Sequence, residues 1–191
     1  GTIYEGRTPE PVFKAVRELI KEDRIQGSDI RIKLVGNCRR IGNEETTEVV
    51  RRWGLYGIVE LSAFIPHNEA ISIMKRSHLL LLLAPNQPLA IPAKIYDYFG
   101  SGAKILALTE DGATSELIKA TDTGVSFTHD NISAIKEYIY GLMTTERRDA
   151  IRNSAENYAR FNIEFLSRRL ADELSDISGG RVAVKSRNFG I

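Results

Sequence analysis

The segment IPAKIYDYFGSG, residues 91–102, contains polar side chains at a spacing that could bind an anion. It predicts a short helix from about Pro92 to Ser101, because proline is favoured at the first position of a helix. Ile91 comes before it and has no side chain that could cap the free backbone N–H groups. An uncapped helix start attracts anions such as phosphate, and Lys94 adds a cation to the first turn.

Lys94, Asp97 and Tyr98 are spaced so that they share one face of the predicted helix. One alternative is that Lys94 is solvated and simply pairs with Asp97 or Tyr98, so that it binds no ligand. Ile95 and Phe99 lie on another face, which we expect to pack against a sheet.

Strand-like and helix-like segments alternate along the chain. The predicted strands are residues 2–4, 30–35, 57–62, 78–83, 104–108 and 124–127. The predicted helices are residues 9–21, 43–53, 68–76, 92–101, 115–119, 132–143, 146–161 and 163–177. This order predicts an α/β fold, with a doubly wound, mostly parallel Rossmann-like sheet and helices on both faces. Ligands of such folds bind at the carboxyl ends of the strands.

The composition limits the classes of protein to consider. The 191 residues carry a net charge of +1, which gives no reason to expect a nucleic-acid partner. One cysteine excludes an internal disulfide and a cysteine-based zinc site, and no apolar run reaches the length of a membrane span. We predict one domain over residues 1–177 and a basic, glycine-containing tail over residues 178–191. Because Gly1 begins inside a strand-like segment, we expect the chain to be part of a longer protein.

Other reactive residues give weaker indications. Cys38 lies beside Arg39 and Arg40, which could lower the pKa of its thiol, although an incidental thiol is the simpler interpretation. His67 lies in a loop at a strand end, where it could contact a ligand or be solvated. The sequence contains no Gly-x-Gly-x-x-Gly motif after its first strand, no Walker phosphate loop and no serine elbow.

Four motifs follow successive predicted strands. They are Gly6-Arg7, Val35-Gly36-Asn37, the loop Phe64-Ile65-Pro66-His67 with Asn68-Glu69-Ala70, and the segment 91–102 leading into Lys104-Ile105-Leu106-Ala107. Together they resemble the C-terminal, donor-binding half of group 1 (family 4) glycosyltransferases of the two-domain GT-B fold. Each motif alone is loose, but their order at matching strand ends is more specific, and the resemblance extends to about residue 177.

This resemblance implies a donor domain that binds a nucleotide-diphosphate sugar for retaining transfer to a saccharide or lipid-linked acceptor, without a metal or other cofactor. Arg7 and Lys94 would stabilise the leaving diphosphate, and Asp97 would accept hydrogen bonds from the ribose. The remaining donor-binding residues would be Gly6, Asn37, Phe64, Ile65, Pro66, Pro92 and Ala93. The chain departs from the family pattern at Leu89, where an acid usually contacts the sugar, and at Val12, where a lysine is usual.

The resemblance also implies partners and a location. The nucleotide sugar would be the ligand, and an N-terminal acceptor-binding domain of the parent chain would complete the enzyme, so that the fragment is inactive alone. We expect a cytoplasmic protein at the inner face of the membrane, acting in the biosynthesis of a polysaccharide or glycolipid, with no nucleic acid. The alternatives are a nucleotide-sugar epimerase of the same architecture and a non-catalytic nucleotide-binding module, which Leu89 keeps open.

Overall fold

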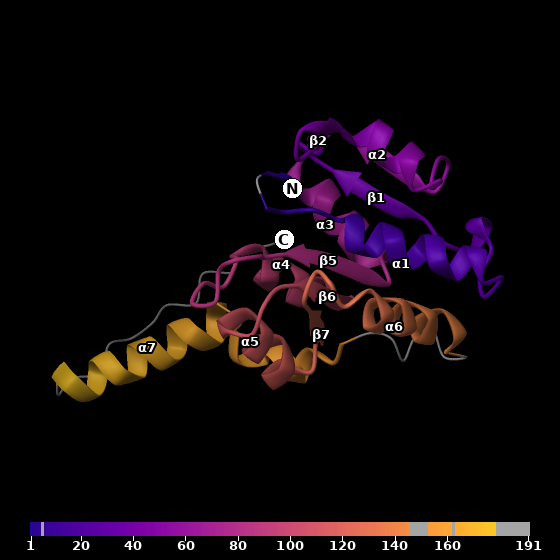
Figure 1. Ribbon diagram of the computed structural model, residues 1–191. Coiled ribbons are helices and arrows are strands. Elements are labelled where there is room, and N and C mark those ends of the chain that lie inside the picture. Colours follow the sequence, from indigo (N-terminus) through magenta and orange to yellow (C-terminus); the bar gives the residue numbers. More distant parts are fainter. Residues whose placement is uncertain (5, 146–152, 162, 179–191) are drawn as a thin grey trace. The chain divides into compact units, whose positions relative to one another are not determined.

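The computed structural model describes residues 1–4, 6–145, 153–161 and 163–178 (Figure 1). The chain divides into two compact units, Gly1–Asn153 and Ser154–Ile191. All the predicted site residues belong to the first unit. The prediction that residues 1–177 form one domain stays a prediction.

Three parallel strands form the larger ladder of the first unit. They are β5 (Leu79–Leu83), β6 (Lys104–Leu108) and β7 (Gly124–Phe127), with β6 in the middle. β5 and β6 pair in register over the whole length of both strands. Such strands can be apolar on both sides because parallel sheets are covered by helices on both faces, which explains the five consecutive leucines of β5.

A second parallel pair consists of β1 (Ile32–Val35) and β4 (Val59–Ser62). The strand predicted over residues 2–4 is reduced to a single parallel bridge between Thr2 and Asn37. Backbone hydrogen bonds on both sides of this bridge hold the N-terminal segment beside the carboxyl end of β1. The segment therefore lies at the edge where a ligand of this fold class is expected.

The helix predicted over residues 43–53 begins later, because a β-hairpin occupies the start of this segment. β2 (Arg40–Ile41) pairs antiparallel with β3 (Glu44–Glu45), and α2 (Thr46–Arg52) follows. Gly42 in the turn has a φ of 57°, a conformation that glycine adopts without strain. The charged residues of this segment show no apolar alternation that would distinguish a short hairpin from a first helical turn.

Helices cover both faces of the strands. The other helices of this unit are α1 (Glu10–Lys21), α3 (His67–Arg76), α4 (Lys94–Ser101), α5 (Ala113–Thr121) and α6 (Ile132–Thr144). One hydrophobic cluster joins α1, α2 and α6 to Leu83, Leu106 and Leu108 of the strands. The alternate strand residues point to the opposite face and are also buried, among them Leu82 and Ile105. The predicted Rossmann-like α/β fold is confirmed.

α1 and α6 lie side by side (Figure 1), although they are far apart in the sequence. Leu19 of α1 and Ile135 of α6 belong to the same core cluster, and both are fully buried. Beside them, the Arg24 guanidinium donates to both carboxylate oxygens of Glu137, at 2.5 and 2.8 Å. Arg24 also stacks on the Tyr140 ring, 3.9 Å from its centroid. α1 is thus covered by α6, which is the last helix of this unit among the described residues.

The second unit contains a 3₁₀ helix, Ala155–Phe161, and α7 (Ile163–Ser178). The helix predicted over residues 146–161 is therefore wrong in type where it can be compared, and its residues 146–152 lie outside the described part. α7 agrees with the helix predicted over residues 163–177. The predicted tail lies outside the described residues from position 179 onward. No helix in the described ranges has both the length and the apolar character needed to cross a bilayer.

Candidate functional site

α4 begins at Lys94, two residues later than predicted, with Ala93 in the N-cap position. Pro92 precedes the helix, and its carbonyl oxygen accepts the Ile95 N–H at 3.0 Å in a tight first turn. As predicted, no side chain caps this helix. Within the described part of the chain, the backbone N–H groups of Ala93 and Lys94 donate to no protein acceptor. The start of α4 therefore offers two free donors at the positive end of the helix dipole.

The apolar face of α4 lies against the sheet, as predicted: Ile95 and Phe99 are buried. Tyr98 is turned toward the sheet too, because its hydroxyl donates to the carbonyl oxygen of Leu81 at 3.2 Å. Burial, with a smaller contribution from Asp97, raises the pKa of Tyr98 to about 12. Tyr98 is thus a structural contact of α4 with β5.

Lys94 is half-buried, and no ion pair or hydrogen bond joins its side chain to the described residues. The alternative in which it pairs with Asp97 is therefore not observed, and Asp97 likewise has no such partner among them. Burial lowers the pKa of Lys94, and repulsion from Arg7 lowers it further. A Cβ atom on Gly1 would lie 3.7 Å from the Lys94 Nζ, and the Asn37 N–H donates to the Gly1 carbonyl oxygen at 2.8 Å.

Arg7 lies in the turn that follows the N-terminal segment and is also half-buried. Its backbone N–H donates to the Tyr4 carbonyl oxygen at 2.9 Å, and its guanidinium lies 4.1 Å from the centroid of the Tyr4 ring. Its side chain forms no ion pair with any described residue. Gly6 has a φ of 76°, and a Cβ atom there would lie 3.8 Å from Pro85, so this turn contacts the loop after β5. Arg7 and Lys94 are thus two neighbouring cations without an acidic partner in the described ranges.

The loop predicted to hold a base, residues 64–66, lies on the same edge of the fold. The Gly36 N–H donates to the Ser62 carbonyl oxygen at 2.9 Å, so the loops after β1 and β4 are adjacent. Phe64 is 74% exposed, Pro66 is exposed and Ile65 is half-buried. Within the described part of the chain, no hydrogen bond, ion pair or ring contact joins these three residues to Arg7 or Lys94. The structure brings Gly6, Arg7, Asn37 and Lys94 together, with the aromatic loop at the same edge of the fold.

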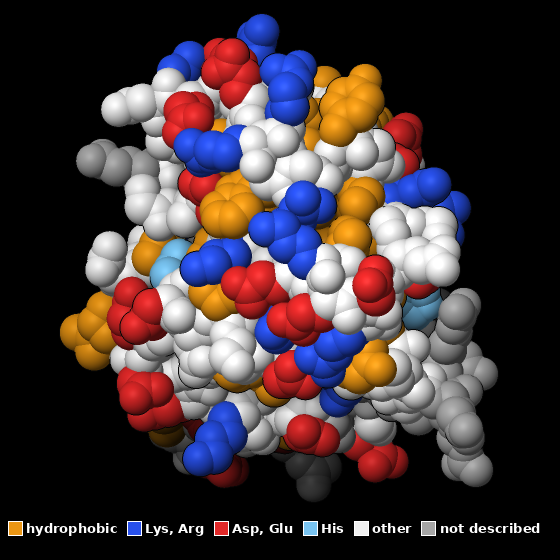
Figure 2. Space-filling view, turned by 45° about the vertical axis from the view of Figure 1, so that its right-hand side comes forward, with side chains coloured by type: hydrophobic (Ala, Val, Ile, Leu, Met, Phe, Trp, Pro, Cys, Tyr) orange, Lys and Arg blue, Asp and Glu red, His pale blue; other side chains and the backbone are white. Residues whose placement is uncertain are grey.

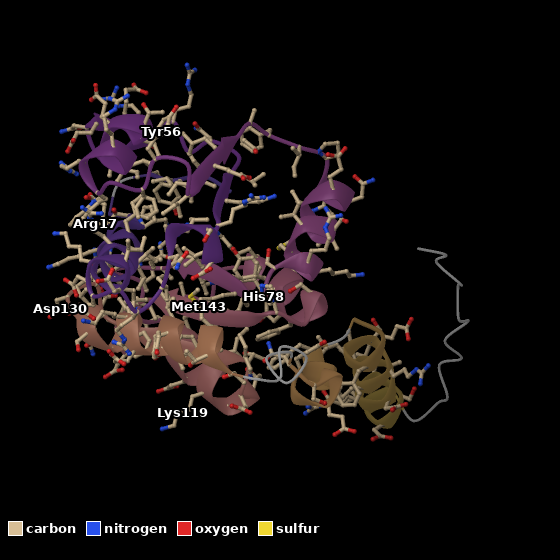
Figure 3. The ribbon with its side chains drawn as sticks, turned by 90° about the vertical axis from the view of Figure 1, so that its right-hand side faces the viewer. Arg17, Tyr56, His78, Lys119, Asp130 and Met143 are labelled. Carbon is tan, nitrogen blue, oxygen red and sulfur yellow. The ribbon has the colours of Figure 1, made fainter. Side chains whose placement is uncertain are left out.

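Cys38 and the histidines do not add a reactive group to this site. Cys38 is buried, and burial raises the pKa of its thiol, which agrees with the interpretation of Cys38 as an incidental thiol. Arg40 instead pairs with Glu45 at 2.9 Å. His67 is the exposed first residue of α3. His78 precedes β5 at its amino end (Figure 3), away from the carboxyl-end loops.

Sequence reasoning missed the contacts of the loop at residues 85–93, which leads into α4. Three hydrogen bonds attach this loop to the β6–α5 turn, defined as residues 109–114, which includes the first two residues of α5. Leu89, which stands where the resemblance predicts an acid, is 93% exposed between two of them. Gly112 was a signal in the sequence, because glycine marks turns. Its sequence context does not show that the turn contacts the loop at residues 85–93.

Neither the face of the molecule in Figure 2 nor the acidic residues of the described ranges indicate another class of site. Figure 2 shows acidic and basic side chains interspersed over the visible face, with no extended area of one sign. Among the described residues, no three His, Cys, Asp or Glu side chains lie together as metal ligands would.

Several solved structures share this fold at low sequence identity. HepE of Anabaena, solved in complex with UDP, is 18% identical, has a TM-score of 0.63 and matches 92% of this chain and 47% of its own. WaaG, a glycosyltransferase involved in lipopolysaccharide biosynthesis, is 17% identical, with a TM-score of 0.62 over 94% of this chain and 46% of its own. The pneumococcal O-GlcNAc transferase GtfA, solved with UDP and GlcNAc, is 12% identical, with a TM-score of 0.64 over 93% and 34%.

No protein-family model matches the sequence, and neither does any curated protein. The chain spans about half of the length of HepE and of WaaG. At identities this low the similarity concerns the fold alone. The described residues have a Rossmann-like α/β fold similar to that of these solved structures, among them the glycosyltransferase WaaG.

Proposed function

We propose that this chain binds a nucleotide-diphosphate sugar and is the donor-binding half of a retaining glycosyltransferase. One observation carries the proposal: Arg7 and Lys94 are half-buried, close enough to repel each other, and without an acidic partner in the described residues. Two such cations beside free backbone N–H groups favour a ligand with two negative charges, which a diphosphate supplies. The UDP complexes of the structurally similar HepE and GtfA support this choice.

Arg7 and Lys94 would also be the catalytic groups. Transfer of the sugar leaves charge on the departing diphosphate, and fixed cations and N–H groups stabilise such charge without a metal. Asp97 would accept hydrogen bonds from the ribose hydroxyls, and Phe64, Ile65 and Pro66 would contact the base. Backbone groups would complete the donor site at Gly6, Asn37, Pro92 and Ala93.

The rest of the enzyme would lie in an N-terminal domain that binds the acceptor. A saccharide or a lipid-linked saccharide at the inner face of the membrane would serve as acceptor, in a cytoplasmic step of polysaccharide or glycolipid biosynthesis. WaaG, whose fold is similar, is a glycosyltransferase involved in lipopolysaccharide biosynthesis. No nucleic acid takes part.

Calorimetry with nucleotides and nucleosides tests the proposal. UDP, GDP and ADP are each titrated beside uridine, guanosine and adenosine. We expect one diphosphate to bind at least about tenfold more tightly than its nucleoside, because hydrogen bonds to charged groups contribute about 1.5–3 kcal/mol each. Equal affinities for every pair, or no binding of any diphosphate, would contradict the proposal.

Replacing Asp97 tests the contact with the ribose. We expect Asp97→Ala to weaken UDP binding about 10- to 150-fold, the loss of a charge-assisted hydrogen bond of about 1.5–3 kcal/mol. The wild type should also prefer UDP to 2′,3′-dideoxy-UDP, and the variant should bind both equally. A preference that persists in Asp97→Ala would show that another group holds the ribose. Unfolding of the variant, seen as loss of its thermal transition, would show that Asp97 is structural.

A non-catalytic nucleotide-binding module is the second candidate. It is favoured by Leu89, which is 93% exposed and offers no polar group to a sugar. Both candidates predict diphosphate binding, so an assay of sugar transfer by the parent protein separates them.

A further inference from the structure

We propose that the β6–α5 turn, residues 109–114, positions the phosphate-binding start of α4 by holding the loop at residues 85–93. This inference rests on the proposed function, because it concerns how the same site is built. Thr114 and Gly112 would be positioning residues: neither has to touch the ligand, and both act through the loop.

The loop has little of its own structure to hold it. Its one internal backbone hydrogen bond before the turn into α4 joins the Ala90 N–H to the Gln87 carbonyl oxygen at 3.2 Å. Leu89 between them is 93% exposed, so no apolar contact buries the loop tip. Loops of this kind open easily unless other groups fix their backbone.

The β6–α5 turn supplies the missing contacts at three points. The Asn86 N–H donates to Glu110 Oε2 at 2.8 Å. The Ala113 N–H donates to the Pro88 carbonyl oxygen at 2.7 Å. The Thr114 hydroxyl donates to the Ala90 carbonyl oxygen at 2.8 Å. Because Pro88 and Ala90 flank Leu89, these bonds fix the backbone on both sides of the exposed tip.

Two features show that this contact is closely fitted. Thr114 is only 1% exposed, so its hydroxyl has no water to replace the Ala90 carbonyl as a partner. A Cβ atom on Gly112 would lie 2.3 Å from the Pro88 carbonyl oxygen and 2.7 Å from the Pro88 Cα atom. Real Cβ atoms do not approach backbone atoms so closely, so any side chain at Gly112 must displace the loop.

The held end of the loop leads directly into the site. Ala90, the last residue bonded to the turn, is three residues from Ala93, whose N–H is one of the two free donors at the start of α4. Lys94 follows. Displacing the loop therefore moves the free N–H groups and the lysine relative to Arg7, which lies on the separate N-terminal turn.

The test compares Thr114→Val and Gly112→Ala with matched controls. Thr121→Val removes another buried hydroxyl of α5, one that donates to Leu117 and not to the loop. Gly141→Ala adds a Cβ atom that meets nothing within 4 Å. Thr114→Ser keeps the hydroxyl and should therefore behave like the wild type. Each variant is assayed for UDP affinity, for thermal stability and, without nucleotide, for hydrogen exchange of residues 86–94.

We expect Thr114→Val and Gly112→Ala to speed exchange in residues 86–94 and to weaken UDP binding about five- to tenfold, the size expected for one net hydrogen bond. Thr114→Ser should keep both the loop exchange rate and the UDP affinity of the wild type. Thr121→Val should lower only the thermal midpoint. The inference is overturned if loop exchange is unchanged in both variants, if exchange rises without loss of affinity, or if Thr121→Val loses as much affinity. Failure of the wild type to bind any nucleoside diphosphate would overturn the proposed function and this inference together.

Discussion

Residues 1–191 alone should transfer no sugar, even from a donor that they bind. The chain matches 47% of HepE and 46% of WaaG, and the proposed function places the acceptor-binding half in an N-terminal domain outside residues 1–191. Positioning two reactants can lower a barrier by about 7–11 kcal/mol, which corresponds to more than about 10⁵ in rate. In the proposed function, residues 1–191 hold the donor, and the N-terminal domain supplies the wall that orients the acceptor.

A radiolabelled donor with mixed saccharide and lipid acceptors measures this activity. The parent protein is the positive control, and every reaction is run with and without a chelator. Turnover by residues 1–191 would contradict the proposal that they are half of an enzyme. Turnover by the parent protein that stops with the chelator would contradict a metal-free reaction.

Lys94→Met should weaken UDP binding about 10- to 150-fold, the loss of a charge-assisted contact of about 1.5–3 kcal/mol, and should leave uridine binding unchanged. The same substitution should stabilise the free protein. Burial and Arg7 lower the pKa of Lys94, which means that the fold disfavours its charge. Each 1 kcal/mol gained would raise the thermal midpoint by about 2–4 °C in a chain of this size. Calorimetry and thermal melting measure both effects.

The pH dependence gives an independent check. Lys94 must be protonated to hold a diphosphate. Above the second pKa of the terminal phosphate, about 6, UDP affinity should be constant, and it should fall as pH rises through the lowered pKa of Lys94, below the ordinary 10.5. Burial raises the pKa of the nearby Cys38 thiol, so this group can titrate at high pH as well. Lys94→Arg keeps the thiol and a fixed charge, and should flatten the curve. If the pH dependence of UDP affinity in Lys94→Arg is identical to that of the wild type, Lys94 does not contact the diphosphate.

The sequence predicted the strands of the parallel ladder better than the hairpin and the start of α4. β6 and β7 have the predicted bounds, because apolar runs beside glycines leave little choice of register or length. The hairpin at residues 40–45 was missed, since two strands of two residues each have no periodicity to detect. The start of α4 was predicted two residues early. Proline is favoured at the first position of a helix, but Pro92 lies in the turn that precedes α4.

The candidate site was predictable in its residue types and not in its pairings. Lys94 and Asp97 have the spacing of an i,i+3 pair, yet in the structure they do not meet. The charged neighbour of Lys94 is Arg7, which comes from a turn some ninety residues earlier in the sequence. The bond between Thr114 and Ala90 spans 24 residues, and nothing in either local sequence indicates it. Contacts of this kind follow from the assembled fold.

The contact between α1 and α6 has a consequence for how the chain folds during synthesis. α1 ends at Lys21 and α6 at Thr144, so a ribosome adding about 5–20 residues per second completes α6 roughly 6–25 s after α1. During that interval the apolar side of α1, including the fully buried Phe13, Val16 and Leu19, has no α6 to cover it. The nascent chain should therefore present α1 as a chaperone-binding segment until α6 has been made.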